Sequence, residues 1–459
     1  MSTLKVNKLR DTAGSADAIT LDPNGGAVIA GVTTVSSVKV GSGVTISSDG
    51  DVFTTGITTS STVIVGSGVT ISESGIEASG IGITCANING GQISGRRNII
   101  INGAMQVAQR GTSSTASSGY NTVDRIKQSH GGADEAPTYA QVDVASGTTP
   151  YTLGFRKAFK VTNGNQTSGA GAGDYIQIDY FPEAQDIANS GWNYTSTSSY
   201  VTVSFWIKSS VAQAFPFTFR TQDGTSQAYN TSTGSLTADT WTKITKTIPG
   251  NSNLQFDNDN DKGARLMFFP YIGTTYTTNG LTLDTWSVWA DAKHSFEMAT
   301  TWWTTNDATW EITGFQLEVG SQATAFEHRS YGDELELCQR YFVMFGGNAT
   351  AWRLGFAWVS SATKAYLDVH LPTTMRAIPS QIYTNGTAGN YQVHGASSAS
   401  ATGSQIINSS SLPAIHAQST KHLVQLEMTT AGSLIQGRIA WFRSSSSTSV
   451  YLGIGAELA

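Results

Sequence analysis

Residues 40–47 read Val-Gly-Ser-Gly-Val-Thr-Ile-Ser, and the same stretch recurs unchanged at 65–72. A second phrase repeats at the same spacing, because Gly-Val-Thr-Thr at 31–34 is echoed by Gly-Ile-Thr-Thr at 56–59. Both offsets are 25 residues. The beginning of the chain is therefore built from a 25-residue repeat.

A third, more diverged copy precedes these two, because the same offset places Ile19–Leu21 on residues 44–46. Within a copy the apolar residues share one parity, and glycines mark the turns between them. In the central copy these apolar residues are Val38, Val40, Val44 and Ile46. Alternation with period 2 is the signature of a β-strand. Each repeat therefore predicts short strands separated by glycine-containing turns.

Units of this kind cannot bury an apolar face alone, and at least about three of them must stack to form a core. Three copies with such short strands in one chain bury too little apolar surface for a core. Identical chains wound around a shared axis, related by cyclic symmetry, would complete the core. We therefore expect residues 1–95 to form an intertwined, homotrimeric β shaft. The alternative is a disordered linker, since Gly/Ser/Thr-rich segments often stay unfolded; the regular Val/Ile alternation disfavours it.

The composition of the whole chain favours strands over helices. Of its 459 residues 39% are hydrophobic but only 13% are charged, and there are 48 glycines. Helices need long-stemmed, mostly charged residues on their solvent face, whereas the Thr, Val and aromatic residues abundant here fit a pleated surface. We expect an all-β protein of two or three units.

Charge and hydropathy patterns exclude several classes of function. The net charge is -6 and the basic residues are scattered, so the sequence predicts no basic patch that would bind nucleic acid. No run of about 20 apolar residues predicts a membrane span, and the first residues have no apolar segment typical of a signal peptide. Cys85 and Cys338 are too few and too far apart to define a disulfide framework or a metal site. This is compatible with assembly in a reducing cytoplasm.

From about residue 96 aromatic residues become frequent, and strand-like segments alternate with polar turns. These segments are 175–180, 200–207, 215–219, 241–248 and 310–312. Many short strands with polar turns predict a jelly roll or β-sandwich over 96–330. A short connector helix is expected at 331–342, where Leu335, Cys338 and Phe342 share a face. Strand patterning then resumes in a smaller C-terminal β domain at 343–459.

Four phrases occur in an order that is similar to a known family. They are RNIIINGAMQVAQRG at 97–111, VSFWIKS at 203–209, ITGFQLEVGS at 312–321 and ELCQRYF at 336–342. In this order they resemble tail fibre and related virion proteins of tailed bacteriophages with a jelly-roll domain similar to carbohydrate-binding modules. The phrase LPTTMRAIP at 371–379 resembles the region that often follows, and residues 3–7 resemble fibre N-termini of marine phages.

This resemblance implies a fibre located on the virion tail and assembled in the host cytoplasm. Its N-terminal region would attach to tail or baseplate proteins, and its distal β domains would bind the bacterial host surface, including glycans. Two alternatives remain: a purely architectural head fibre or collar component, and a glycan-degrading tailspike. No nucleic acid or membrane insertion is implied.

Sugar recognition uses aromatic ring faces, and Trp302 and Trp303 are the candidates from the sequence. Adjacent residues of a strand point to opposite faces, so one of the two could be exposed for carbohydrate binding. A loop that packs both rings is an equally good interpretation. Trp206 and Trp310 lie within strand segments and are expected to be core residues.

Asp257, Asp259 and Asp261 place carboxylates at alternate positions, as at the start of a calcium loop. The pattern then fails, because Gly263 falls at position 7 rather than 6 and Phe268 occupies the place of the final Glu. A calcium site is therefore the weaker interpretation and a solvated turn the stronger, and no other cofactor is expected.

The sequence does not predict an enzyme. The seven histidines show no metal-binding spacing, and no Gly-x-Ser-x-Gly elbow supports a nucleophile. Glycoside cleavage needs two carboxylates about 5–9.5 Å apart, which sequence alone does not reveal. The candidate acids for such a pair are Asp174, Asp179, Glu183 and Glu311.

Overall fold

The structure, a computed structural model, divides into two compact units, Met1–Thr84 and Cys85–Ala459. In the second unit it describes residues 97–347, 349–395, 406–432, 434–447 and 449–458. In the first unit it describes the backbone of six short strands. The prediction of an all-β protein is confirmed, because nearly all of these elements are strands in antiparallel sheets.

The first unit contains two three-stranded sheets. One consists of β1 (Lys8–Leu9), β2 (Ile19–Leu21) and β3 (Ala27–Ile29), and the other of β4 (Thr62–Val65), β5 (Val69–Ser72) and β6 (Gly75–Ala78). β5 falls within the repeat copy at 65–72, and β2 coincides with the diverged copy. The copy at 40–47 lies outside the described residues, and the homotrimeric shaft stays a prediction.

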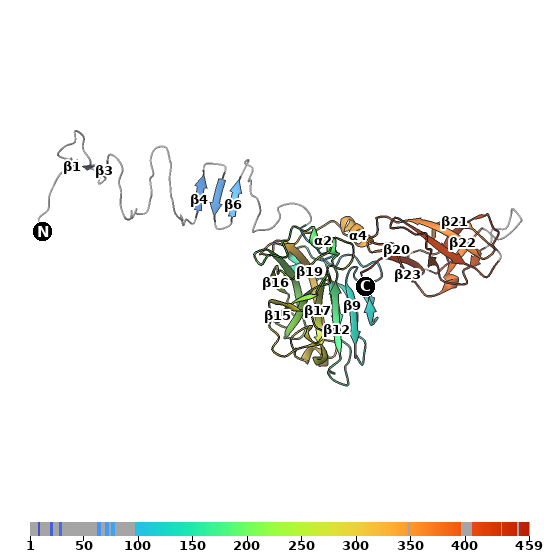
Figure 1. Cartoon of the computed structure of the whole chain (residues 1–459), viewed down its shortest axis with the longest axis horizontal. Coiled ribbons are helices and arrows are strands. Elements are labelled where there is room, and N and C mark those ends of the chain that lie inside the picture. The colour runs from blue at the N-terminus through green and yellow to red at the C-terminus, as the bar shows by residue number, and fades with distance from the viewer. Residues whose placement is uncertain are drawn as a thin grey trace. The chain divides into compact units, whose positions relative to one another are not determined.

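Residues 97–330 form a jelly-roll domain of two facing sheets (Figure 1). The six-stranded sheet has the order β16 (Thr242–Pro249), β13 (Tyr200–Ser209), β19 (Thr309–Val319), β11 (Lys157–Thr162), β10 (Thr138–Asp143) and β7 (Ser113–Ser114). The seven-stranded sheet has the order β18 (Thr285–Val288), β15 (Gln227–Ser235), β14 (Ala214–Thr221), β17 (Ala264–Ile272), β12 (Tyr175–Tyr180), β9 (Lys127–Gly131) and β8 (Ser118–Gly119). Short helices, α1 (Thr149–Thr152), α2 (Ala184–Ala188) and α3 (Thr301–Thr304), connect the strands.

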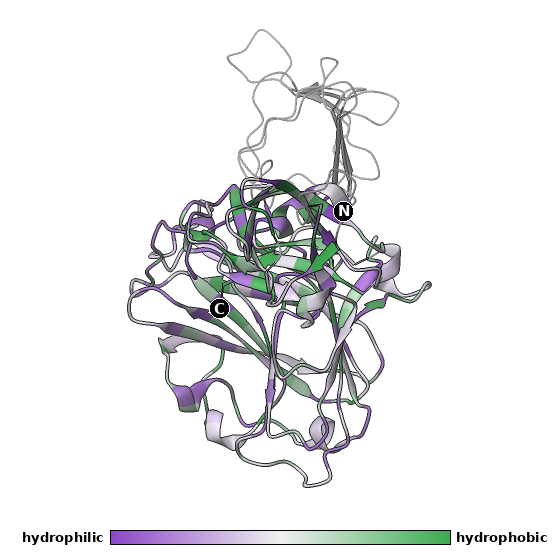
Figure 2. Ribbon diagram, turned by 90° about the vertical axis from the view of Figure 1, so that its right-hand side faces the viewer, coloured by the Kyte–Doolittle hydropathy of each residue, from purple (hydrophilic) through white to green (hydrophobic). Residues whose placement is uncertain are grey.

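The core of the jelly roll forms because alternate residues of each strand point between the sheets. Hydrophobic and hydrophilic residues are interleaved along the strands (Figure 2). At the centre Phe205 of β13 meets Phe217 and Phe268 of the opposite sheet edge-on, with ring centroids 5.1 and 5.2 Å apart. Phe315 packs against Phe268 at 5.2 Å. These edge-to-face contacts fix the spacing between the sheets.

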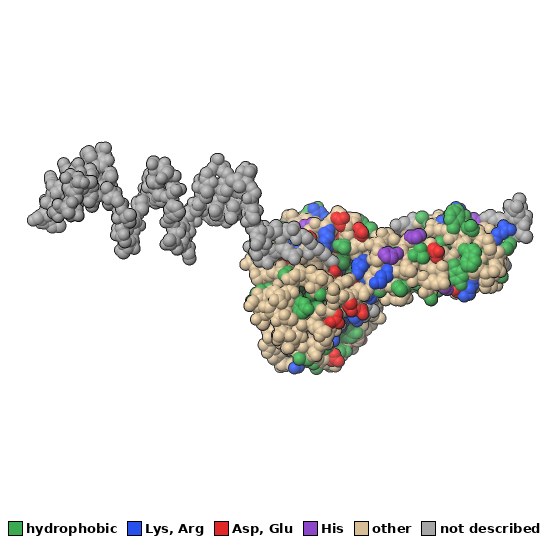
Figure 3. All heavy atoms as spheres, turned by 45° about the horizontal axis from the view of Figure 1, so that its top comes forward, with side chains coloured by type: hydrophobic (Ala, Val, Ile, Leu, Met, Phe, Trp, Pro, Cys, Tyr) green, Lys and Arg blue, Asp and Glu red, His purple; other side chains and the backbone are tan. Residues whose placement is uncertain are grey.

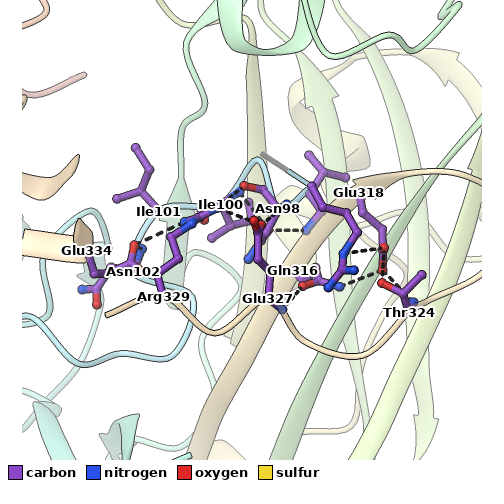
Figure 4. Close-up of polar contacts among 12 residues, drawn as sticks. Asn98, Ile100, Ile101, Asn102, Gln316, Glu318, Thr324, Glu327, Arg329 and Glu334 are labelled. Atoms are coloured by element: carbon purple, nitrogen blue, oxygen red, sulfur yellow. Dashed lines mark hydrogen bonds and ion pairs between the residues drawn. The ribbon is translucent and has the colours of Figure 1, made fainter. Parts of the chain in front are cut away.

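The segment after Arg97 is held to the jelly roll by hydrogen bonds between side chains and backbone groups (Figure 4). The side-chain oxygen of Asn98 accepts the N–H groups of Ile100 and Leu317, both at 3.0 Å. Arg329 donates to the carbonyl oxygens of Asn98 and Ile100. The first of the four phrases that carry the family resemblance therefore has a structural role here.

Helix α4 (Tyr331–Gln339) leads from the jelly roll to the C-terminal domain. The hydroxyl of Ser330 caps it by accepting the N–H of Asp333 at 3.2 Å. The predicted helix extended to residue 342, but α4 ends three residues earlier and Phe342 begins a strand instead. Among the described residues, none of the helices meets the length and hydropathy that a bilayer crossing requires.

The C-terminal domain contains two more antiparallel sheets. The small one has the order β20 (Phe342–Gly346), β29 (Tyr451–Gly455) and β23 (Gln381–Thr384). The seven-stranded one has the order β25 (Ile406–Asn408), β24 (Tyr391–His394), β28 (Ile439–Ser444), β21 (Arg353–Val359), β22 (Lys364–His370), β27 (Leu423–Thr429) and β26 (Ala414–Ile415). One face of the larger sheet packs on its own core, which includes Val359, Leu367, Leu426 and Phe442.

Buried ion pairs tie the end of the C-terminal domain to the jelly roll. The Glu457 carboxylate lies 2.9 Å from the guanidinium nitrogens of both Arg110 and Arg125. Arg125 also covers the ring of Tyr341, 3.4 Å from its centroid. Nearby, Glu183 pairs with Arg340 through two contacts of 2.7 Å. A buried charge is tolerated only when paired, so these contacts select one arrangement of the segments involved.

Replacing Glu457 with Gln should destabilise the protein by about 3–5 kcal/mol, because the two buried arginines would lose their shared carboxylate. Asp143→Asn is the matched control, since Asp143 pairs with Lys157 at 2.6 Å on the surface and exposed pairs contribute little. Urea unfolding measures both variants. Equal, small effects of the two substitutions would contradict the structural role of Glu457.

Candidate functional site

The structure places Trp302 and Trp303 in the short helix α3 and buries both rings completely. Their indole nitrogens donate to the carbonyl oxygens of Thr309 and Gly169, at 3.0 and 2.8 Å. Trp303 also stacks on Tyr271 with centroids 4.7 Å apart. The idea that a strand would expose one of them is wrong, because a helical turn directs both into the core. Neither presents a ring to a ligand.

Asp257, Asp259 and Asp261 lie in the loop before β17, and their carboxylates do not converge. Asp259 accepts the N–H of Asp261 at 2.9 Å, and Asp257 accepts from Gln255 at 3.1 Å. Asp261 approaches Arg376 at 3.7 Å. Within the described ranges no three His, Cys, Asp or Glu side chains are grouped to hold a metal ion. The calcium site gains no support from this geometry.

The four candidate acids are each engaged in other contacts. Glu183 pairs with Arg340, and Glu311 lies 3.1 Å from Lys208. Asp174 accepts the N–H of Gly171 at 2.6 Å. Asp179 has a different setting, because it lies beneath an open cleft on the outer face of the seven-stranded sheet of the jelly roll.

This cleft has a volume of about 210 Å³ and is lined by Ser129, Tyr175, Gln177, Arg265, Tyr276 and His294. Strands β9, β12 and β17 form its floor. Its wall is the strap, which we define as residues 273–299 and which contains η1 (Thr274–Tyr276), β18 and η2 (Asp291–Lys293). The strap is fixed to the sheet where the Thr218 hydroxyl donates to the His294 carbonyl oxygen at 2.8 Å.

Asp179 organises the floor of the cleft. Its buried carboxylate accepts two hydrogen bonds from Arg265, at 2.9 and 2.8 Å, and two from the Gln177 amide, at 2.8 and 2.9 Å. Both side chains are thereby held in one orientation. These bonds use Nε and Nη2 of Arg265 and Nε2 of Gln177, which leaves Nη1 of Arg265 as a donor and Oε1 of Gln177 as an acceptor for a ligand.

Aromatic rings form the wall of the cleft. Tyr276 meets Tyr175 edge-on at 5.8 Å and His294 at 5.5 Å. Behind them Trp289 packs on His294 with centroids 4.4 Å apart. Ring faces beside fixed donors and acceptors suit a ligand that is apolar on one side and hydroxylated on the other. A sugar ring has this chemistry.

His294 enters the cleft as a neutral imidazole. Burial first, and then the nearby Arg265 guanidinium, lower the pKa of His294 to about 4. Its buried Nδ1 has no hydrogen-bond partner within the described ranges. The ring is therefore uncharged at neutral pH and carries an unpaired polar atom beside the cleft.

The C-terminal domain carries a second candidate surface, the aromatic face, defined as Phe356, Trp358, Tyr366, Ile439 and Trp441 on β21, β22 and β28. Phe356, Trp358 and Ile439 are 61%, 55% and 70% exposed. Phe356 stacks on Trp441 at 3.9 Å, and Trp358 on Tyr366 at 6.3 Å. Hydrophobic side chains gather over this domain in Figure 3. Contiguous exposed apolar patches mark interaction surfaces.

The cleft was not predicted from the sequence. One signal was available, because Tyr175, Gln177 and Asp179 share the parity opposite to the apolar Ile176 and Ile178 and must point away from the core. The strap gave no such signal, since Tyr276 and His294 come from a segment without strand or helix periodicity.

Acid should destabilise the protein partly through His294. In the unfolded chain the imidazole takes up a proton near pH 6.5, whereas in the folded protein it does so only near pH 4. The unfolded state therefore binds more protons between these values, and stability falls as pH falls. Between pH 7 and pH 4.5 the melting temperature of the His294→Asn variant should fall less than that of the wild type. An equal fall would contradict this titration of His294.

Neither a protein-family model nor a curated protein matches the sequence. Solved structures with detectable similarity include the enzymatically active domain of tailspike protein 4 from bacteriophage CBA120, at 11% identity over 48% of this chain and 21% of that chain, with a TM-score of 0.26. The N-terminal cellulose-binding domain of Cellulomonas fimi β-1,4-glucanase C matches at 10% identity over 48% of this chain and 99% of its own, with a TM-score of 0.23. The tandem family 22 carbohydrate-binding modules of Paenibacillus barcinonensis match at 9% identity over 82% and 100%, also with a TM-score of 0.23. Likenesses this distant identify neither a ligand nor an activity.

Proposed function

We propose that this protein is a fibre of a tailed-phage virion that binds a glycan on the bacterial host surface through the cleft of its jelly-roll domain. The observation that carries the proposal is the cleft itself, where ring faces of Tyr175 and Tyr276 lie beside free polar atoms of Gln177, Arg265 and His294. The resemblance of the four ordered phrases to virion fibres supports the phage context. The N-terminal region would attach to tail or baseplate proteins.

Glycan binding should depend on Tyr276. In a glycan array followed by titration calorimetry with the full chain, Tyr276→Ala should weaken binding at least about tenfold, because an aromatic contact of this size contributes about 1.5–3 kcal/mol. Tyr276→Phe, which keeps the ring, should lose less. Tyr331→Ala is the control, since Tyr331 is an exposed tyrosine on α4 away from the cleft.

If the wild type binds no glycan from susceptible host cells, or if Tyr276→Ala binds as well as the wild type, the cleft is not the receptor site. Release of reducing sugar from host polysaccharide would favour the tailspike alternative instead. Equal loss in Tyr276→Ala and Tyr331→Ala would indicate a general effect on folding.

We also propose that the chain forms a homotrimer, and that the aromatic face is a contact between its copies. The repeat supports this, because its strands are too short to form a core alone. The aromatic face has Arg353 and Arg443 at one side and Asp368 at the other, where Glu427 is already paired with Lys364 at 2.7 Å. Copies related by rotation would bring these opposite charges together.

Sedimentation of the full chain should give a trimer. A benzophenone amino acid in place of Phe356 should crosslink on illumination to β21, β22 or β28 of another copy, read by mass spectrometry. The control position is Leu153, an exposed residue of the jelly roll. A monomer in sedimentation contradicts the trimer, and crosslinks no more frequent than at Leu153 contradict the role of the aromatic face.

A further inference from the structure

Two arginines lie directly opposite each other beside the cleft. Arg220 of β14 and Arg265 of β17 are register partners in antiparallel strands, so their side chains lie on the same outer face of the sheet. Like charges at directly opposed positions destabilise a sheet. An anion placed near both guanidinium groups would offset this repulsion.

Among the described residues, Asp179 is the one buried carboxylate on the outer face of these strands. Lys127 of β9 is the register partner of Asp179, so the four neighbouring strands β14, β17, β12 and β9 present Arg220, Arg265, Asp179 and Lys127. These strands thus present three cations and one anion, and the exposed Asp291 of the strap is a second acid that acts on Arg220. Asp179 is already saturated by its four hydrogen bonds from Arg265 and Gln177.

Arg220 is held in place without being neutralised. Its guanidinium lies 4.0 Å from the ring centroid of Trp289, and its Nε donates to the Ser226 hydroxyl at 3.0 Å. In the described part of the chain Arg220 forms no ion pair. The nearest acid of the strap, Asp291, is exposed and accepts the indole N–H of Trp289 at 3.3 Å. Trp289 in turn packs on His294, so Arg220 stands one ring behind the wall of the cleft.

We propose that the cleft selects an acidic sugar, whose carboxylate, sulfate or phosphate group is bound by Arg265, while the positive charge of Arg220 acts on it from behind the aromatic wall. This inference rests on the proposed glycan binding and names its ligand class. The free Nη1 of Arg265 donates to the anionic group, and guanidinium groups suit such oxyanions because their donors form a planar fork. Tyr276 and Gln177 contact the neutral part of the sugar.

The test uses the full chain on an array of uronate-containing, sulfated, phosphorylated and neutral glycans. The best-bound acidic glycan is then compared with its own neutralised form, carboxyl-reduced or desulfated as its chemistry requires. Arg220→Gln should weaken binding of the acidic form about three- to tenfold, because it removes a positive charge near the anionic group without removing a hydrogen bond to it. It should bind the neutralised form like the wild type.

Arg156→Gln is the matched control, because Arg156 is an exposed arginine that also lies 4.0 Å from the centroid of an aromatic ring, that of Tyr151, outside the cleft. It should bind like the wild type. Arg220→Gln should keep a melting temperature near that of the wild type, since removing one of two opposed arginines relieves repulsion. A large fall would assign Arg220 a structural role and overturn the inference.

Other outcomes separate this inference from the proposed function. Binding of neutral glycans only, lost in Tyr276→Ala, keeps the receptor site and overturns the acidic preference. Acidic binding that Arg220→Gln leaves unchanged also overturns it. If no glycan binds, both proposals fail.

Discussion

The pairing of buried charge is the constraint on which this structure depends. Asp179 is buried beneath the outer face of the jelly roll, so its carboxylate requires hydrogen bonds. Arg265 and Gln177 donate these bonds and are thereby held in fixed positions. Glu457 does the same at the other end of the chain by gathering Arg110 and Arg125. One rule therefore fixes both the floor of the candidate site and the anchoring of the C-terminal segment.

The cleft also depends on the strap. The sheet alone would offer an open pleated surface, and residues 273–299 turn it into a cleft by carrying Tyr276 and His294 over β17. Rings and polar atoms thus come from different parts of the chain. The strap supplies most of the aromatic wall and the sheet supplies the hydrogen-bonding floor, so substitutions in each can be made separately.

Sequence periodicity predicts the β class well, because strand alternation and scarce charge are local properties. The short helix after residue 330 is also predicted, although its C-terminal end is placed too far along, since the apolar Phe342 fits a helical face and a buried strand equally well. Trp302 and Trp303 show the limit of this reasoning. Their burial depends on a single helical turn, α3, that periodicity cannot reveal in so short a segment.

The residues of the cleft come together only through tertiary structure. Arg220 and Arg265 are separated by β15, by β16 of the other sheet and by the loop before β17, and nothing local marks them as register partners. Gln177 and Asp179 could be assigned to an outer face, but not to a cleft without the strap. Among the phrases that resemble virion fibres, 97–111 and 336–342 supply Arg110 and Arg340 to the ion pairs between the domains, whereas 203–209 and 312–321 lie in the jelly-roll strands β13 and β19.

A crystal structure of the protein with its bound host glycan would test the receptor site most directly. A sugar ring against Tyr276, with its acidic group within hydrogen-bond distance of Arg265, is the expected result. A glycan seated elsewhere, for example on the aromatic face of the C-terminal domain, would contradict the assignment of the cleft.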